Sequence, residues 1–288
     1  MIEFEGLPGA LPDLVNPVMV AAFEGWNDAG DAASGALEHL ERVWQAKVVA
    51  SLDPEDYYDF QVNRPEVSLE ADGSRTITWP NTRLSISRIP LASRDVVLVH
   101  GIEPSMRWKA YVQELLGVVR DLGVEMVITL GALLADTPHT RPVPVTGTSS
   151  DPGLALRLGY EASTYEGPTG IVGVLAEACN TAGIPSVSLW AAVPHYVAQP
   201  PCPKATLALL GRIEDLLELA VPLGDLPEEA RAWQDGVDEL ARDDDEVAAY
   251  VRQLEDARDT TELPEASGEA IAKEFERFLR RRGPEGAQ

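Results

Sequence analysis

Short continuous apolar runs alternate with helical patterns along the first 220 residues. Residues 17–23 read Pro-Val-Met-Val-Ala-Ala-Phe, which is typical of a strand buried on both faces. A polar loop follows, and the apolar residues between 32 and 44 then recur at helical spacing. Asp31 is placed to cap this helix. The chain is therefore predicted to open as strand, loop and helix.

The same rhythm returns further along the chain. Strands are predicted over residues 48–52, 95–102, 126–130 and 186–193, and helices over residues 104–122, 170–182 and 205–220. Pro104 is expected in the first turn of its helix, where proline is tolerated because the first amides have no intrahelical partner. This alternation of strands and helices indicates an α/β fold.

Two segments depart from the rhythm. Residues 75–79 and 82–89 flank Pro80-Asn81 and predict a β hairpin, whose antiparallel strands would make the sheet mixed. Residues 132–150 read as a long connection rich in proline and threonine. Connections of this length in compact domains are usually either functional or disordered.

The character of the chain changes after Pro222. Residues 227–258 are heavily acidic and show apolar positions at helical spacing (Leu226, Ala230, Trp233, Val237, Leu240 and Ala241), and a second helix is predicted over residues 265–282. We therefore expect an α/β core domain over residues 1–222 and an acidic helical extension over residues 223–288. The apolar stripe must pack on the core, on the extension itself or on a partner, and packing within the chain is favoured.

The charge balance narrows the classes of partner. With 47 acidic and 23 basic residues the formal net charge is -24, which repels phosphate backbones and anionic lipid surfaces. We expect neither nucleic acid nor a membrane as partner. The N-terminus lacks the pattern of a signal peptide, and Cys179 and Cys202 fit free thiols in a reducing compartment. We expect a cytoplasmic protein that needs no metal and no cofactor.

Polar residues collect where four predicted strands end, and ligands of open α/β sheets bind beyond such carboxyl ends. Three of the four histidines lie at these places. The candidate pocket residues are Glu24, Trp26, Asn27 and Asp28 at the end of the first strand, His100 and Glu103 at the end of the second, His139 and Arg141 beyond the third, and His195 beyond the fourth.

Two interpretations of these residues stay open. In one, they form a polar pocket in which a histidine acts as acid or base near neutral pH, as in a small-molecule-binding protein or a hydrolase. In the other, they cap helices and satisfy buried carbonyl groups. The sequence has no G-x-S-x-G elbow, no phosphate-binding P-loop and no dinucleotide-binding glycine motif. It therefore assigns no catalytic residue.

The segment Glu-Gly-Trp-Asn-Asp-Ala-Gly over residues 24–30 resembles the opening motif of the proteasome assembly chaperone family, in its bacterial branch. Other segments are similar to that family in order and spacing: His-Gly-Ile-Glu-Pro (100–104), residues 131–142, Gly-Pro-Thr-Gly (167–170) and residues 189–196. The resemblance covers roughly residues 1–220 and treats the acidic helices as a C-terminal extension.

The resemblance implies a three-layer α/β/α fold with a mixed sheet, similar to phosphorylase/hydrolase-like domains. It also implies a homo-oligomer, for which a trimer or another small closed ring is compatible with symmetric self-association. The implied function is that of a protein-binding scaffold or assembly factor with a proteasome-related partner. The resemblance brings no established catalytic residues to this branch. A hydrolase or phosphorylase-like enzyme that uses the strand-end pocket remains the alternative.

Overall fold

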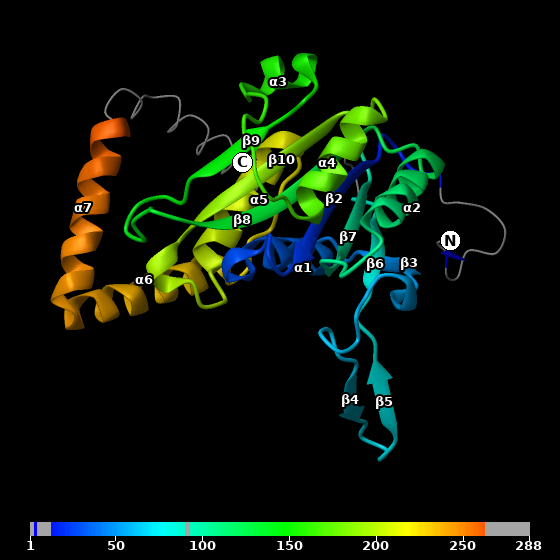
Figure 1. Cartoon of the computed structure of the whole chain (residues 1–288), viewed down its shortest axis with the longest axis horizontal. Coiled ribbons are helices and arrows are strands. Elements are labelled where there is room, and N and C mark those ends of the chain that lie inside the picture. Colours follow the sequence, from blue (N-terminus) through cyan, green and yellow to red (C-terminus); the bar gives the residue numbers. More distant parts are fainter. Residues whose placement is uncertain (1–2, 5–12, 90–92, 263–288) are drawn as a thin grey trace, which may run out of the picture. The chain divides into compact units, whose positions relative to one another are not determined.

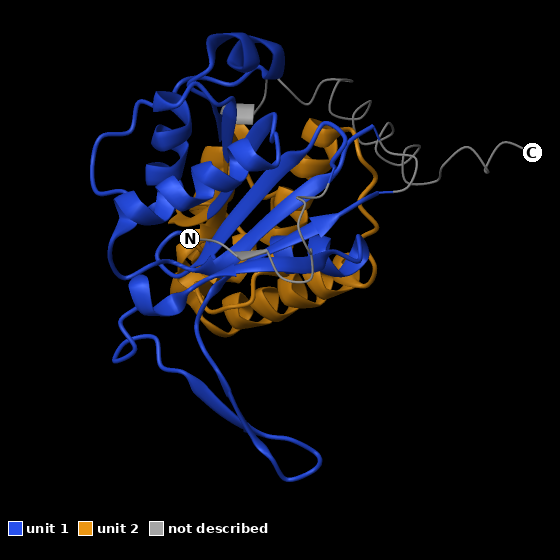
Figure 2. Ribbon diagram, turned by 90° about the vertical axis from the view of Figure 1, so that its right-hand side faces the viewer, with its two compact units in different colours: residues 1–27, 37–131, 147–188 blue, residues 28–36, 132–146, 189–288 orange. Residues whose placement is uncertain are grey.

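The computed structural model describes residues 3–4, 13–89 and 93–262 (Figure 1). The helix predicted over residues 265–282 lies outside this part of the chain. The chain divides into two compact units (Figure 2): unit 1 comprises residues 1–27, 37–131 and 147–188, and unit 2 comprises residues 28–36, 132–146 and 189–288.

The strands are β1 (Glu3–Phe4), β2 (Val18–Glu24), β3 (Lys47–Leu52), β4 (Glu66–Leu69), β5 (Arg75–Thr78), β6 (Thr82–Ser87), β7 (Val96–Ile102), β8 (Met126–Ala135), β9 (Val145–Thr148) and β10 (Ser186–Pro194). The helices are α1 (Ala32–Val43), α2 (Trp108–Asp121), α3 (Pro152–Leu158), α4 (Ile171–Thr181), α5 (Pro203–Leu217), α6 (Leu226–Asp243) and α7 (Asp245–Glu262). Short 3-10 turns cover Ala29–Asp31, Pro54–Asp56 and His195–Val197.

The main sheet has the strand order β1-β3-β6-β7-β2-β8-β10-β9, and every one of these strands contributes residues to unit 1. The four predicted strands near positions 17, 95, 126 and 186 are therefore neighbours, as expected. Strand β2 runs parallel to β7 and β8, whereas β3 and β6 pair antiparallel. The sheet is thus mixed, and its central strand β2 is almost wholly apolar because both of its edges and both of its faces are covered.

Strand β6 shows how helices cover both faces of this sheet within unit 1. The Thr82 hydroxyl contacts Tyr111 of α2, whereas the next residue, Arg83, binds Glu41 of α1. Because successive side chains of a strand point to opposite faces, α2 and α1 lie on opposite sides. Helix α4 packs beside α2, as Figure 1 shows. The α/β fold with helices on both faces of a mixed sheet is confirmed.

The predicted hairpin around Pro80-Asn81 is wrong. Strand β5 pairs with β4 in a separate two-stranded sheet, and β6 lies between β3 and β7 in the main sheet. The turn of the real hairpin contains Asp72-Gly73, where Gly73 has a φ of 84° that favours glycine. Alternation on either side of Pro80 misled the prediction because two strands can share a pattern without sharing a sheet. The β4–β5 hairpin, called the arm below (residues 62–79), projects from unit 1 (Figure 2).

Three further expectations need correction. Helix α2 begins at Trp108 rather than Pro104, because the Ser105 and Met106 amides donate to the Tyr57 carbonyl instead of joining the helix. The connection over residues 132–150 is partly strand, since β8 continues to Ala135 and β9 adds an edge to the sheet. Finally, the side chain that caps α1 is Asp28, not Asp31.

Unit 2 contains the C-terminal helices. Helix α6 packs against α5, and α7 packs against α6. The apolar stripe of α6 is largely buried at Leu226, Ala230, Val237 and Ala241, whereas Leu240 is exposed. This stripe packs within its own chain, as expected. None of the helices in the described residues is long and apolar enough to cross a membrane.

Candidate functional site

In unit 1, His100 of β7 is completely buried among charged side chains. Arg83 donates from Nη2 to His100 Nδ1 and from Nε and Nη2 to the two carboxylate oxygens of Glu41, at 3.2 and 2.7 Å. With Nδ1 accepting, the neutral imidazole carries its hydrogen on Nε2. The register explains the grouping, because Arg83 lies opposite His100 on the neighbouring strand and so on the same face.

The second ring nitrogen of His100 faces the strand end. His100 Nε2 lies 3.6 Å from Glu24 Oε1, and among the described residues it has no hydrogen-bond partner. The Glu24 side chain is about half exposed, at 49%. Burial acts to raise the pKa of Glu41, but the contacts with His100 and Arg83 outweigh it and lower that pKa to about 2. Glu41 is therefore ionised at neutral pH. The His100 ring lies between two carboxyl groups, with Glu41 near Nδ1 and Glu24 near Nε2.

A second contact in unit 1 joins three of the sequence motifs. Glu103 Oε1 accepts from Asn27 Nδ2 at 2.7 Å and from the Ile171 amide at 2.8 Å. The carboxylate thus caps the N-terminus of α4, where negative charge is favourable. The preceding residue is glycine because a Cβ on Gly170 would lie 2.2 Å from Asn27 Oδ1. Asn27 and Glu103 therefore have an evident structural role.

The remaining residues of the opening motif differ in their surroundings. Trp26, in unit 1, is 66% exposed. Asp28, in unit 2, is buried and accepts from the Ala33 and Ser34 amides, at 2.6 and 3.3 Å for Oδ1, and from the Ser34 hydroxyl. Burial raises the pKa of Asp28 to about 6, although these hydrogen bonds oppose the shift. Asp28 is thus a helix cap held in an apolar setting.

In unit 2, His139 is 1% exposed and both of its ring nitrogens are bonded. The Tyr196 hydroxyl accepts from the His139 amide at 2.8 Å and lies 2.7 Å from Nδ1, while Nε2 lies 3.0 Å from Asp238 Oδ1 of α6. A hydroxyl that donates to Nδ1 and a ring that donates to Asp238 satisfy every atom. Burial lowers the pKa of His139, against the opposing effect of Asp238.

Arg141 and His195 complete the group in unit 2. Arg141 binds Asp259 through Nε and Nη2, at 2.9 and 2.8 Å, and Glu255 through Nη1 at 3.0 Å. His195 Nδ1 lies 3.2 Å from Asp136 Oδ1, which also accepts from the Tyr250 hydroxyl at 3.0 Å. The loop between β8 and β9 is therefore fastened to α6 and α7 by polar contacts.

The nine candidate residues fall into separate sets. Unit 1 brings Glu24 close to His100 and joins Asn27 to Glu103, with Trp26 exposed beside them in sequence. Unit 2 holds Asp28, His139, Arg141 and His195, and of these His139 and Arg141 both bind the C-terminal helices. In the part of the chain that the structure describes, no group of three or more histidine, cysteine, aspartate or glutamate side chains is arranged to hold a metal ion.

The chain is similar to a known protein family. A family model described as the PAC2 family matches residues 22–241, which is most of the chain. The chain belongs to the PAC2 family. The resemblance found in its motifs is thereby confirmed. No curated protein matches this chain.

Solved structures of PAC2 proteins resemble this one closely. The crystal structure of a PAC2 family protein from Streptomyces avermitilis is 66% identical with a TM-score of 0.78, covering 82% of this chain and 99% of that one. The proteasome-assembly chaperone homologue of Mycobacterium tuberculosis is 54% identical with a TM-score of 0.75, covering 81% and 99%. An archaeal proteasome activator from Pyrococcus furiosus, 18% identical with a TM-score of 0.65 over 83% and 98%, shares the fold.

Sequence reasoning missed the partners of the PAC2 motif residues. Glu41 and Arg83 complete the group around His100, and Asp238, Glu255 and Asp259 bind His139 and Arg141. None of them lies in a recognised motif. Glu41 lies on a helix, and Arg83 lies on another strand than His100. The pairing of β6 with β7 brings Arg83 to His100, and the packing of α1 on β6 brings Glu41 to Arg83. The sequence also shows the acidic run after Pro222, but nothing in it indicates which carboxylates bind His139 and Arg141.

Proposed function

We propose that this PAC2 protein is a cytoplasmic, homo-oligomeric assembly factor that binds protein partners and catalyses no reaction. Membership of the PAC2 family, together with the proteasome-assembly chaperone homologue among its similar structures, supports a role in assembling a proteasome-related complex. The observation that carries the proposal is the arm of unit 1, which offers apolar side chains to solvent.

The arm has one apolar and one polar face. Val67 pairs with Ile77 across the two strands and Leu69 lies two residues on, so all three point to the same side, and they are 53, 53 and 74% exposed. Arg75 pairs with Leu69 and adds one cation to this side. Glu66, Ser68, Thr76 and Thr78 occupy the opposite face. Exposed apolar patches mark protein-binding sites, and a two-stranded hairpin has little stability of its own in water. A partner protein that covers this face would stabilise it.

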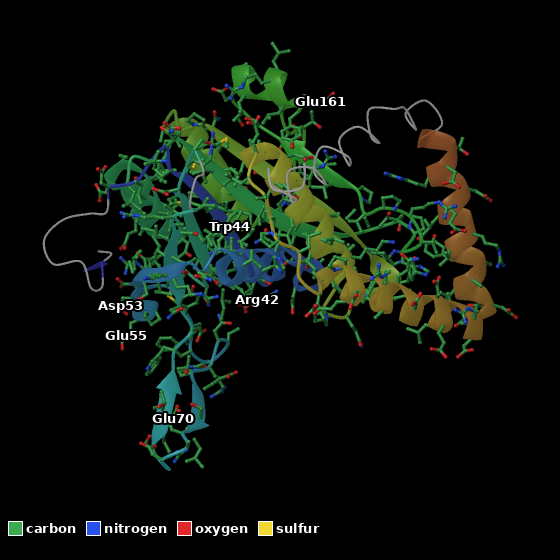
Figure 3. All side chains as sticks on the ribbon, turned by 180° about the vertical axis from the view of Figure 1, so that it is seen from behind. Arg42, Trp44, Asp53, Glu55, Glu70 and Glu161 are labelled. Carbon is green, nitrogen blue, oxygen red and sulfur yellow. The ribbon has the colours of Figure 1, made fainter. Side chains whose placement is uncertain are left out.

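The surroundings of the arm indicate the charge of that partner. Figure 3 shows Glu70 on the arm and Asp53 and Glu55 near its base. All three residues are exposed. With a net charge of -24 on the whole chain, these carboxylates favour a partner with basic residues around an apolar groove, and Arg75 on the apolar side requires an acceptor within that groove.

The test compares the two faces of the arm. The variant Leu69→Asp/Ile77→Asp places charges on the apolar face, and Ser68→Asp/Thr78→Asp places the same charges, at the same diagonal spacing, on the polar face. We expect affinity capture from native cells to recover the same proteins with the wild type and the polar-face variant, and to lose them with the apolar-face variant. Recovery that does not distinguish the two variants would refute the role of the arm. Native mass spectrometry of the wild type reports the subunit number.

A second candidate function rests on His100. We propose as the alternative that the group around Glu24 and His100 binds a small molecule, in a hydrolase or phosphorylase-like activity at the strand ends. The observation in its favour is the buried Nε2, which has no hydrogen-bond partner among the described residues and faces the half-exposed Glu24. Native mass spectrometry should then find a retained ligand that Glu24→Gln loses and Glu38→Gln keeps. If wild type and both variants carry no ligand and turn over no ester or phosphoester, this alternative is wrong.

A further inference from the structure

Helix α7 is attached to the loop between β8 and β9 by a small number of polar contacts. Arg141 uses all three nitrogens of its guanidinium to bind Glu255 and Asp259, which lie one helical turn apart on α7. The Thr140 hydroxyl also donates to Glu255. We call Thr140 and Arg141 the clamp. It is a cationic fork in a strongly acidic chain, and it matches two carboxylates at a spacing of four residues.

The clamp is open to solvent. The Arg141 and Asp259 side chains are 32 and 54% exposed, and ion pairs of this kind exchange readily with water and with other carboxylates. Of the larger apolar side chains of α7, Val251 and Leu254 are buried. Tyr250 donates to Asp136 of the same loop and packs edge-on against the rings of His195 and Tyr196. None of these contacts prevents an identical helix from taking the place of α7.

The joint between α6 and α7 is a single residue. Asp244 has φ -131° and ψ 108° and separates two helices of 18 residues each. The bend is not imposed by glycine or proline, since residues 237–262 contain neither. Asp244 instead stabilises it as a cap, accepting from the Glu246 and Val247 amides at 2.9 and 3.2 Å. A continuous helix through Asp244 would lose this cap but gain the helical hydrogen bonds that the bend interrupts.

In the bent form the contacts of α7 compensate for the helical hydrogen bonds that the bend interrupts. In the continuous form α7 leaves its own clamp, and Arg141, Val251 and Leu254 are exposed. When two copies exchange their α7 helices, each helix finds on the other copy the same contacts that it leaves on its own, because the surroundings are identical. Short hinges of this kind favour such exchange.

We propose that α7 exchanges between copies of this chain: straightening at Asp244 carries α7 to a second copy, whose Thr140–Arg141 clamp receives Glu255 and Asp259. The proposal rests on the self-association in the proposed function and names a surface for it. Reciprocal exchange produces a dimer, and exchange passed from one copy to the next produces a closed ring.

Two charge-reversed variants of the full chain test the exchange. In Arg141→Glu the clamp repels its own α7, and in Glu255→Arg/Asp259→Arg the helix is repelled by its own clamp. When the two variants are mixed, the helix of each variant has the charges that fit the clamp of the other. Native mass spectrometry of an equimolar mixture should show complexes that contain both variants in about tenfold excess over those that contain one, as a preference of about 1.4 kcal/mol produces.

Matched controls separate the possible outcomes. Glu246→Arg/Asp256→Arg makes the same charge change on α7 away from the clamp, and mixed with Arg141→Glu it should show no excess of mixed complexes. The triple variant Arg141→Glu/Glu255→Arg/Asp259→Arg should recover the hydrogen-exchange protection of α7 that Arg141→Glu loses. If complexes form but mix at random, the exchange is refuted and self-association stands. If the wild type and all mixtures stay monomeric, both are wrong.

Discussion

Two buried histidines, one in each unit, have opposite surroundings. His139 of unit 2 uses both ring nitrogens, with Tyr196 on one and Asp238 on the other. His100 of unit 1 is bonded at Nδ1, whereas its Nε2 has no hydrogen-bond partner among the residues that the structure describes and faces Glu24 across 3.6 Å. A histidine with both nitrogens bonded holds elements together, whereas the Nε2–H of His100, beside a half-exposed carboxylate, remains available to donate a hydrogen bond.

The comparison also separates two ways of placing charges. Around His100, the charges come from a helix and adjoining strands of unit 1 and surround a completely buried imidazole. Around His139 and Arg141, the carboxylates come from α6 and α7 and lie near solvent. We therefore expect substitutions in the first group to lower the stability of the whole unit and those in the second to loosen the C-terminal helices locally.

The largest effect is expected for Glu41→Ala. Its removal leaves Arg83 and His100 without their carboxylate, and breaking a buried ion pair is costly because the remaining charge is uncompensated. Since Arg83 partly reaches solvent, we expect the free energy of unfolding to fall by about 2–3 kcal/mol, which is less than the roughly 3–5 kcal/mol that breaking a fully buried pair costs. Chemical denaturation measures it. Glu38→Ala, an exposed position on the same helix, should change little, and equal losses for both would contradict the assignment.

Next in size is Glu103→Ala. The substitution removes the cap of α4 and the partner of Asn27 together, so we expect a loss of about 1–3 kcal/mol. Hydrogen exchange should also show that the first turn of α4 opens more often. Glu125→Ala serves as the control, because its side chain is exposed at the start of β8. An unchanged first turn of α4 would show that Glu103 does not cap this helix.

A smaller effect that depends on pH is expected at His139. Its pKa in the fold is below the ordinary value of 6.5, so the unfolded chain takes up the proton more readily than the folded chain. The contribution of neutral His139 to stability is therefore present above pH 6.5 and declines as the pH falls below it. Between pH 7 and 5, the wild type should lose more stability than His139→Gln.

The group around His100 supplies the contrast for that experiment. The pKa of Glu41 in the fold is about 2, below its ordinary value of 4.5, so its contribution is present above pH 4.5 and is lost as the pH falls toward 2. Glu41→Gln should therefore differ from the wild type in pH dependence only below about pH 4.5. A difference already at pH 6 would mean that another group titrates there.

The smallest effect on global stability is expected for Arg141→Ala. Its ion pairs with Glu255 and Asp259 are exposed to solvent, and pairs of this kind contribute little to folding. The unfolding midpoint should stay within error of the wild type, while amide exchange in α7 accelerates. Lys109→Ala, at an exposed position of α2, should leave α7 unchanged. A large drop in the midpoint would show that α7 is integral to the fold.

Much of the fold of unit 1 could be predicted from the sequence, because buried strands carry their own signal. The run over residues 17–23 is apolar whichever neighbours it acquires. It turns polar at Glu24 because the strand ends there. The helices over residues 170–182 and 205–220 were equally visible, since one apolar face repeats at helical spacing. The arm escaped notice because its Asp72-Gly73 turn lies in a polar stretch with no buried strand beside it.

The candidate residues could be found from the sequence, but their roles could not. Local order places His100 near the end of a strand and His139 beyond one. Nothing in that order says which ring nitrogen will find a partner. Glu41 meets Arg83 because β6 lies between β3 and β7, and Asp238 reaches His139 because α6 packs on α5. Such contacts join residues 42 and 99 positions apart in the chain. The sequence determined which segments are buried, since burial follows composition and period, whereas tertiary packing decided which charges meet.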